Sequence, residues 1–212
     1  VWLIAALLAQ AEISNHSLEA VSNGLKLAYE ALALAQRIGD QTRELYSLIR
    51  VANNLFMLKD HTWHDQAGRA LALARQLGDL KTEVNLLLGI GGAYGMDDLP
   101  RSREYLQEAL SKSKSLNDKA IELSLLEAIG QQFERDGDYY QQLNEYETKR
   151  LHISRQIGNR MAEGNALMFC GQIQGLYLGD YVNGLELEKQ ALALWENLNA
   201  RLFPLLRIAQ IQ

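Results

Sequence analysis

Few side chains in this 212-residue sequence combine the types and spacing that chemistry requires. His61 and His64 lie three residues apart, a spacing that places two imidazole rings on one side of a helical turn, where they could hold a metal ion. No cysteine or third histidine lies nearby in the sequence, and the pair falls at a predicted turn. We therefore expect two solvated turn histidines and no metal site.

The single cysteine, Cys170, stands in an apolar position and has no histidine at a spacing typical of a nucleophile pair, so we expect a buried structural thiol. Asp97-Asp98 and Asp136-Gly137-Asp138 resemble pieces of a calcium loop but lack its twelve-residue ligand spacing, and we expect them to form caps and turns. The sequence contains no Gly-x-x-x-x-Gly-Lys phosphate loop. These observations predict a protein that is not an enzyme and uses no cofactor.

Composition and charge narrow the class of protein further. Hydrophobic residues make up 48% of the chain, which is enough for a sizeable core, and only two prolines interrupt a sequence rich in helix-forming residues. The net charge of −5 and the pI of about 5.4 argue against the basic face that nucleic-acid binding requires. We expect a helical protein that does not bind nucleic acid.

The first eleven residues are apolar and end in Ala-Gln-Ala, which is similar to a signal-peptide cleavage site. The stretch lacks a basic leader, so we expect instead the buried first helix of a repeat. No run of about 18 or more apolar residues occurs, and we predict no membrane span. The lone cysteine excludes an internal disulfide and fits a reducing compartment, so a cytoplasmic location is expected.

One short pattern recurs along the whole chain. An apolar residue is followed by Gly or Asn at positions 39, 78, 117, 158 and 199, and Asp or Asn follows in four of these five cases. Gly and Asn best tolerate a left-handed backbone, and Asp and Asn are good N-terminal caps. The pattern therefore marks the end of one helix and the start of the next, and the intervals of 39 to 41 residues predict helix pairs.

The repeats predicted in this way form one continuous solenoid over residues 1–212. Each pair ends at the recurring Gly or Asn, and the pairs are followed by a sixth repeat that is expected to be truncated. Their ranges are 1–39, 40–78, 79–117, 118–158, 159–199 and 200–212. The predicted helices cover about 2–13, 18–38, 42–58, 63–77, 81–94, 101–116, 119–135, 140–157, 161–178 and 182–198.

Small residues recur at fixed offsets from the same pattern. Thirteen residues after it come Ala52, Gly91, Gly130 and Gly171 in the first helix of each pair. A glycine within a helix costs about 1 kcal/mol relative to alanine, so this repetition predicts tight helix crossings. The second helix of each pair has two positions, seven residues apart, that usually hold a small residue. Trp63, Leu143 and Arg150 replace the small residue at three of these positions.

These features resemble the tetratricopeptide repeat (TPR) family in its long-period form. The family's apolar-Gly-x-x-aromatic core matches Ile90-Gly91-Gly92-Ala93-Tyr94 and Ile129-Gly130-Gln131-Gln132-Phe133, and its Gly-Asp-Tyr turn matches residues 137–139 and 179–181. The resemblance implies an all-α fold, a right-handed α-solenoid of antiparallel helix pairs. HEAT and armadillo repeats share the period and remain an alternative, although they lack the Gly-aromatic core.

In a TPR superhelix the first helix of each pair lines a concave groove. Counting from the small positions, we predict that the ligand-binding residues of the groove include Tyr46, Asn53, Phe56, Asn85, Glu127, Gln131, Glu134, Asn165 and Gln172. Arg50, one turn before Asn54, is expected to add a contact to a carboxylate. Amide side chains both donate and accept hydrogen bonds, so this ladder could pair with an extended peptide. The alternative is an ordinary solvated face. The two glutamates disfavour an acidic ligand and favour a neutral or basic one.

The resemblance implies a non-catalytic scaffold or adaptor module of a larger signalling protein that binds a protein or peptide partner in its groove. An alternative is an effector-sensing regulatory domain of a bacterial signalling NTPase or transcription activator. A third possibility is a structural spacer. Self-association remains possible, because exposed apolar end helices favour it.

Overall fold

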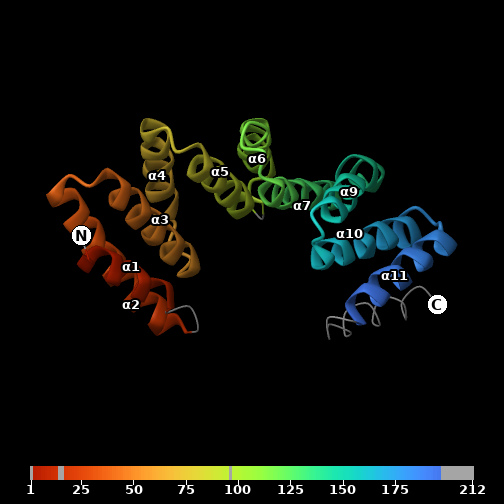
Figure 1. Ribbon diagram of the computed structural model, residues 1–212, viewed down its shortest axis with the longest axis horizontal. Coiled ribbons are helices and arrows are strands. Elements are labelled where there is room, and N and C mark those ends of the chain that lie inside the picture. Colours follow the sequence, from red (N-terminus) through yellow and green to blue (C-terminus); the bar gives the residue numbers. More distant parts are fainter. Residues whose placement is uncertain (1, 14–16, 96, 197–212) are drawn as a thin grey trace. The chain divides into compact units, whose positions relative to one another are not determined.

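The computed structural model describes residues 2–13, 17–95 and 97–196, which form helices joined by short turns and contain no strand. The chain divides into two compact units, Val1–Ile90 and Gly91–Gln212. The division falls inside one helix, α5 (Leu80–Tyr94), whose last turn belongs to the second unit (Figure 1). The predicted all-α fold of packed neighbouring helices is confirmed, while the single continuous solenoid over residues 1–212 stays a prediction.

The first unit contains four complete helices and most of α5. They are α1 (Trp2–Ile13), α2 (Leu18–Ile38), α3 (Gln41–Met57) and α4 (Trp63–Leu77). From α1 to α4 each helix contacts the next, and α1 also contacts α3, so the first helices of successive pairs lie side by side. The core runs through these contacts from α2 to α4 and includes Ala28, Leu48, Leu55 and Ala70, with Leu86 of α5 packed against it.

The second unit continues the pairing with two interrupted helices. After α6 (Leu99–Ser113) and α7 (Lys119–Asp136), the next helix consists of α8 (Tyr139–Gln141), the π-helix η1 (Gln142–Glu147) and α9 (Thr148–Gln156). The following pair is α10 (Arg160–Gln172) with the π-helix η2 (Ile173–Tyr177), and then α11 (Tyr181–Glu196). Contacts join α6 to α7, α7 to η1 and α9, α9 to α10, and α10 to α11.

The recurring Gly or Asn of the sequence pattern adopts the expected left-handed backbone wherever it is described. Gly39, Gly78 and Gly158 have φ values of 69°, 68° and 67°, and Asn117 has a φ of 50°. Gly39 and Gly78 close α2 and α4 by donating their N–H groups to the last carbonyls of the helix. The fifth instance, Asn199, lies outside the described residues.

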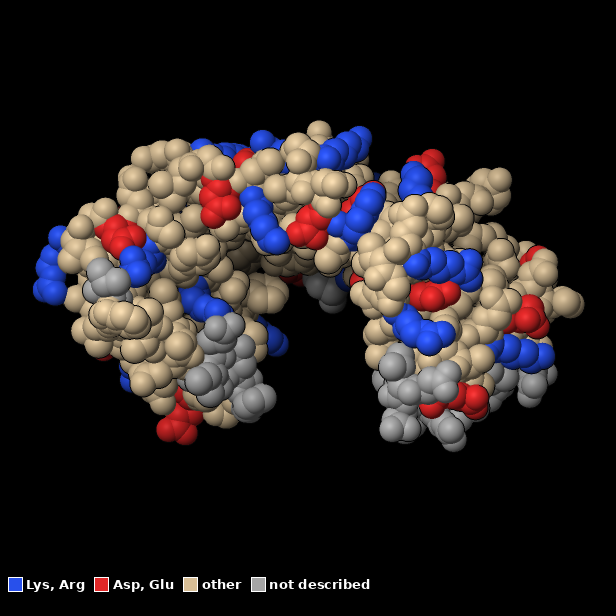
Figure 2. Space-filling model, viewed as in Figure 1, with Lys and Arg blue, Asp and Glu red and all other residues tan. Residues whose placement is uncertain are grey.

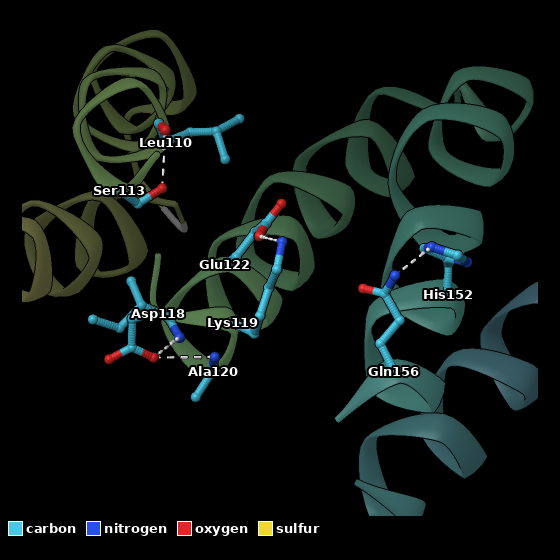
Figure 3. A network of polar contacts seen from close by, with 9 residues as sticks. Leu110, Ser113, Asp118, Lys119, Ala120, Glu122, His152 and Gln156 are labelled. Carbon is cyan, nitrogen blue, oxygen red and sulfur yellow. Dashed lines mark hydrogen bonds and ion pairs between the residues drawn. The ribbon is translucent and has the colours of Figure 1, made fainter. Parts of the chain in front are cut away.

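The residue after each of these turns caps the next helix, as predicted. The side chains of Asp40, Asp79 and Asn159 accept hydrogen bonds from the backbone N–H groups of Arg43, Thr82 and Ala162. Asp118 accepts from the N–H groups of two residues at the start of α7 (Figure 3). Each cap satisfies a donor that the first turn of a helix leaves unpaired.

The predicted tight helix crossings occur at all three glycines. A Cβ atom on Gly91 would lie 2.7 Å from Leu106 Cγ in α6, and one on Gly171 would lie 2.7 Å from the carbonyl oxygen of Gly184 in α11. A Cβ atom on Gly130 would lie 3.0 Å from Glu147 Oε1. At Gly171 the nearest atom is a backbone oxygen, whereas at Gly91 and Gly130 it is a side-chain atom that would have to shift to admit a methyl group.

The predicted helix boundaries agree with the structure to within about three residues, apart from two differences in kind. The helices predicted at 140–157 and 161–178 each contain a π-helical segment, which the sequence reasoning did not foresee. The sixth repeat predicted at 200–212 lies outside the described residues. Within the part of the chain that the structure describes, no helix has both the length and the apolar character needed to span a bilayer.

Candidate binding face

The predicted ligand-binding residues of the first unit lie mainly along one side of α3. Tyr46, Asn53 and Phe56 are exposed, with Tyr46 at 46% and Phe56 at 48%, and Arg50 is partly exposed between them. The spacing of four, three and three residues keeps these side chains on one helical face. The opposite side of α3 is filled with buried apolar residues of the core. The stripe is therefore polar and aromatic, and open to solvent.

Two buried polar side chains of α3 bond to the backbone of their own helix and do not contribute to this stripe. Ser47 Oγ donates to the carbonyl oxygen of Arg43, and Asn54 Nδ2 donates to the carbonyl oxygen of Arg50 at 2.8 Å. Asn54 is only 4% exposed. Of the two adjacent asparagines, Asn53 is thus the one whose amide faces solvent, in agreement with the offset that selected it.

An aromatic row continues from the end of α3 into α4. The Phe56 and Trp63 rings meet edge to face with 5.5 Å between their centroids. The ring centroids of Trp63 and His64 lie 4.3 Å apart, and those of His64 and His61 lie 6.4 Å apart. His61 is exposed and His64 is partly buried against Trp63. The two histidines therefore take part in ring packing, and the described residues include no group of three or more His, Cys, Asp or Glu side chains arranged to hold a metal ion.

The remaining predicted residue of the first unit, Asn85, lies on α5 and is exposed. Its neighbours Val84 and Leu87 are fully buried. Asn85 thus belongs to the solvent side of its helix, as Asn53 does on α3. The role of both asparagines in binding stays a prediction.

In the second unit the predicted residues of α7 differ in exposure. Gln131 is exposed, whereas Glu127 and Glu134 are partly buried. The Glu127 carboxylate lies 3.4 Å from Nη2 of Arg150, which compensates its charge. The predicted repulsion of acidic ligands by the two glutamates therefore rests mainly on Glu134.

The two predicted residues of α10 are less accessible. Asn165 is partly buried. Gln172 is only 4% exposed and donates to the Tyr177 hydroxyl at 3.4 Å, while its Oε1 atom is buried without a hydrogen-bond partner. Gln172 therefore does not present its amide to a ligand in this conformation, in contrast to Asn53 and Gln131. The amide column of the second unit is broken at this point.

The structure adds a buried charged cluster that sequence reasoning missed. Arg150, only 3% exposed, donates from Nη1 to Glu147 Oε2 at 2.7 Å, and its Cζ atom lies 5.6 Å from the centre of the Phe169 ring. Glu147 is 2% exposed and belongs to the π-helix η1. The available signal was Arg150 itself, which stands where the other repeats have a small residue in the second helix.

Burial controls the protonation of this cluster and of the cysteine beside it. Loss of solvation raises the pKa of Glu147 to about 7, although Arg150 acts in the opposite direction. Burial, together with the negative charge of Glu147, raises the pKa of Cys170 to about 12. Cys170 is therefore a protonated, buried thiol, as expected, and is not poised for nucleophilic attack.

The face in view in Figure 2 does not carry charge of one sign, because Lys and Arg side chains lie next to Asp and Glu side chains on it. Ion pairs within one unit include Arg75 with Glu83 at 2.9 Å and Arg155 with Glu163 at 2.8 Å.

Comparison with known proteins establishes the fold but not a family. No protein-family model matches the sequence, and no curated protein matches it. Among solved structures, the chain is similar to the crystal structure of a Rap protein complexed with competence and sporulation factor, with a TM-score of 0.67 at 15% sequence identity. The match covers 97% of this chain and 62% of the Rap chain, so the chain spans about three fifths of that protein's length.

Proposed function

We propose that this protein is a TPR-like, non-catalytic binding module that recognises a protein or peptide segment through the exposed faces of its first helices. The observation that carries the proposal is the stripe on α3, where Tyr46, Asn53 and Phe56 are exposed while the opposite side of the helix packs into the core. The helix thus presents the Tyr46 ring and the Asn53 amide to solvent, together with the half-exposed Phe56 ring, whose edge-to-face contact with Trp63 fixes its position.

The stripe has the chemistry for an extended peptide. The Asn53 amide can donate to a peptide carbonyl and accept from a peptide N–H, which reads the backbone without regard to sequence. Tyr46 and Phe56 supply the large, stiff apolar surfaces that dominate binding energies in protein interfaces. Asn85 and Gln131, exposed on α5 and α7, offer the same amide chemistry in their own units.

The fold likeness supports a binding role. The Rap protein in the similar structure is bound to a factor, and its fold covers nearly all of this chain. A binding role of this kind requires an exposed surface on a fixed helix, and the stripe on α3 provides one. The proposed setting is a larger protein that uses this module as an adaptor.

The experiment is a selection from a random peptide library against the immobilised protein, followed by titration of the enriched peptides. Replacement Asn53→Ala should weaken binding by about tenfold, because a peptide group loses hydrogen bonds worth about 1–2 kcal/mol. Stability should change little, since Asn53 is exposed and has no described packing role.

The matched control is Asn23→Ala, which removes an exposed amide from α2, a second helix of a pair. It should leave the affinity of every enriched peptide unchanged. Peptides that bind both variants as well as the wild type would place recognition away from the α3 stripe. A failure to enrich any peptide would count against the peptide-binding role itself.

A second candidate is an effector-sensing regulatory domain of a bacterial signalling NTPase or transcription activator. The similarity to a Rap protein in complex with a factor named for competence and sporulation favours this candidate. The gene that encodes the chain decides between the two. An adjoining nucleotide-binding or DNA-binding domain would support the sensor role, and its absence would support the adaptor role.

A further inference from the structure

Two turns of the second unit expose an unusual concentration of aromatic and apolar side chains. The first lies at the start of α8 and the second lies between η2 and the start of α11. Tyr140 is 71% exposed, Tyr181 58% and Val182 81%. We call this surface the tyrosine edge, and it consists of Tyr139, Tyr140, Tyr177, Leu178, Tyr181 and Val182.

The two turns form one surface because they contact each other. The rings of Tyr139 and Tyr177 stack at a centroid distance of 3.8 Å with only 7° between their planes, and α8 contacts η2. Gln172 donates to the Tyr177 hydroxyl and ties that ring to α10. A stacked pair thus lies between the exposed residues of the first turn and those of the second.

Side-chain caps fix the backbone at the starts of α8 and α11, which carry the tyrosine edge. Asp138 accepts a hydrogen bond from the N–H of Gln141, and Asp180 accepts from both the backbone N–H and the side-chain amide of Asn183. These caps hold the starts of both helices, so the rings are presented from anchored positions. A ligand that binds there orders little protein, which lowers the entropic cost of association.

The charges around the tyrosine edge are mainly negative. Residues 136–148 and 172–188 contain seven Asp and Glu residues, and the basic residues that directly flank these ranges are Arg135, Lys149 and Lys189. Some are already compensated, since Asp136 pairs with Arg103 and Glu147 with Arg150. Glu145 and Glu186, in contrast, are exposed on the two helices that begin at this edge.

The Tyr139 phenol in the stacked pair holds its proton more firmly than a free tyrosine does. Burial, followed by the neighbouring Tyr177 and Glu134, raises the pKa of Tyr139 above its usual value. A neutral ring keeps the negative face that attracts cations. The two helices that begin at this edge therefore carry both electron-rich aromatic faces and the exposed carboxylates of Glu145 and Glu186.

We propose that the tyrosine edge is a docking surface for a cationic, arginine-containing segment of a protein partner. A guanidinium group stacks on the face of a tyrosine and at the same time donates to a carboxylate, and both groups are present here. Phosphate-bearing and acidic segments are repelled by the same carboxylates. Apolar patches of this kind on a protein surface mark interaction sites. This surface lies at the turns of the second unit, whereas the stripe on α3 belongs to the first unit.

The test measures the fluorescence anisotropy of a labelled octapeptide of alternating glycine and arginine, titrated with the protein at physiological salt. Matched octapeptides with lysine or glutamate in place of arginine serve as probes of charge and shape. The arginine peptide should bind most tightly and the glutamate peptide should not bind. The double variant Tyr140→Ser, Tyr181→Ser should weaken the arginine peptide about tenfold, which corresponds to the loss of two exposed cation–π contacts.

Two controls separate the proposal from general charge attraction. Tyr29→Ser removes a tyrosine from α2 that is 43% exposed, and it should change nothing. The charge reversals Glu145→Lys and Glu186→Lys should abolish binding, whereas Glu30→Lys on α2 should reduce it only slightly. Circular dichroism verifies that each variant is folded.

The proposal is overturned if the double tyrosine variant binds the arginine peptide as well as the wild type does, or if the glutamate peptide binds equally. Sedimentation equilibrium tests whether a second copy of the chain, and not a separate partner, occupies the tyrosine edge. A wild-type dimer that the double tyrosine variant converts to monomers would show that a second copy of the chain occupies the edge. Asn53→Ala should leave this titration unchanged, so the outcome is independent of the role proposed for α3.

Discussion

The close crossing of α10 and α11 yields a sharp prediction, because the same substitution has opposite effects at two helical glycines of the second unit. A Cβ atom on Gly171 would lie 2.7 Å from the carbonyl oxygen of Gly184 and 2.8 Å from Glu188 Cγ, whereas one on Gly92 would meet nothing within 4 Å. Backbone atoms cannot move aside as a flexible side chain can. Gly171→Ala must therefore push the two helices apart.

The magnitudes follow from two opposing effects. Alanine is favoured over glycine in a helix by about 1 kcal/mol, and overpacking costs about 1–3 kcal/mol. We expect Gly171→Ala to lower the free energy of unfolding by about 1–2 kcal/mol and Gly92→Ala to raise it by about 0.5–1 kcal/mol. The two variants should thus differ by about 2 kcal/mol.

The assay is urea unfolding followed by the fluorescence of Trp195, with Trp2 and Trp63 replaced by phenylalanine. Trp195 is buried and packs against Gly164 of α10, so it reports on the crossing itself. For a urea dependence of about 2 kcal/mol per molar, the two midpoints should differ by about 1 M. If Gly171→Ala is as stabilising as Gly92→Ala, the backbones do not approach as closely as described, and the packing argument is refuted.

Three further predictions concern single residues. Because the pKa of Glu147 is raised to about 7 from an ordinary value of 4.5, the native state binds the extra proton, and the contribution of this carboxyl falls as pH rises through that window, by up to about 3 kcal/mol. Glu147→Gln should therefore match the wild type in urea unfolding at pH 5 and exceed it at pH 8, and equal differences at both pH values would contradict this. Arg150→Ala leaves Glu147 and Glu127 without their described cationic partner and should cost about 3–5 kcal/mol at pH 8, measured by denaturant unfolding; an unchanged midpoint would mean that the pair is not buried. Asp118→Ala removes the cap of α7 and should lower the free energy of unfolding by about 1 kcal/mol, while Asp97→Ala at an exposed turn should change it by less than about 0.5 kcal/mol; equal losses would argue against the cap.

The helix ends were predictable because their determinants are local. A left-handed Gly39 or Asn117 followed by a capping Asp40 or Asp118 depends only on a few consecutive residues, and the structure contains these turns as expected. The glycines at tight crossings could also be anticipated, since a helical glycine is costly and its repetition needs a reason. Both the helix-ending turns and the repeated glycines can be recognised from residue type and spacing along the sequence.

The exposure of the predicted groove residues could be anticipated only in part. Helical spacing from Ala52 correctly separated the exposed Asn53 from the buried Asn54 on the regular helix α3. On α10 the same count led to Gln172, which is buried where the helix widens into η2. A periodic count assumes a regular helix, and a π-helical segment shifts the direction of the side chains near it.

The sequence by itself determined that this protein is a series of paired helices, where those helices begin and end, and which glycines lie at crossings, because these properties follow from local backbone preferences and periodicity. Tertiary structure alone decided that Arg150 meets Glu147 and Glu127 in a buried cluster. It also brought the Tyr139 and Tyr177 rings into contact across 38 positions of sequence. Such contacts depend on how neighbouring helices pack and on the charge and volume that meet there, and no pattern within one helix encodes them.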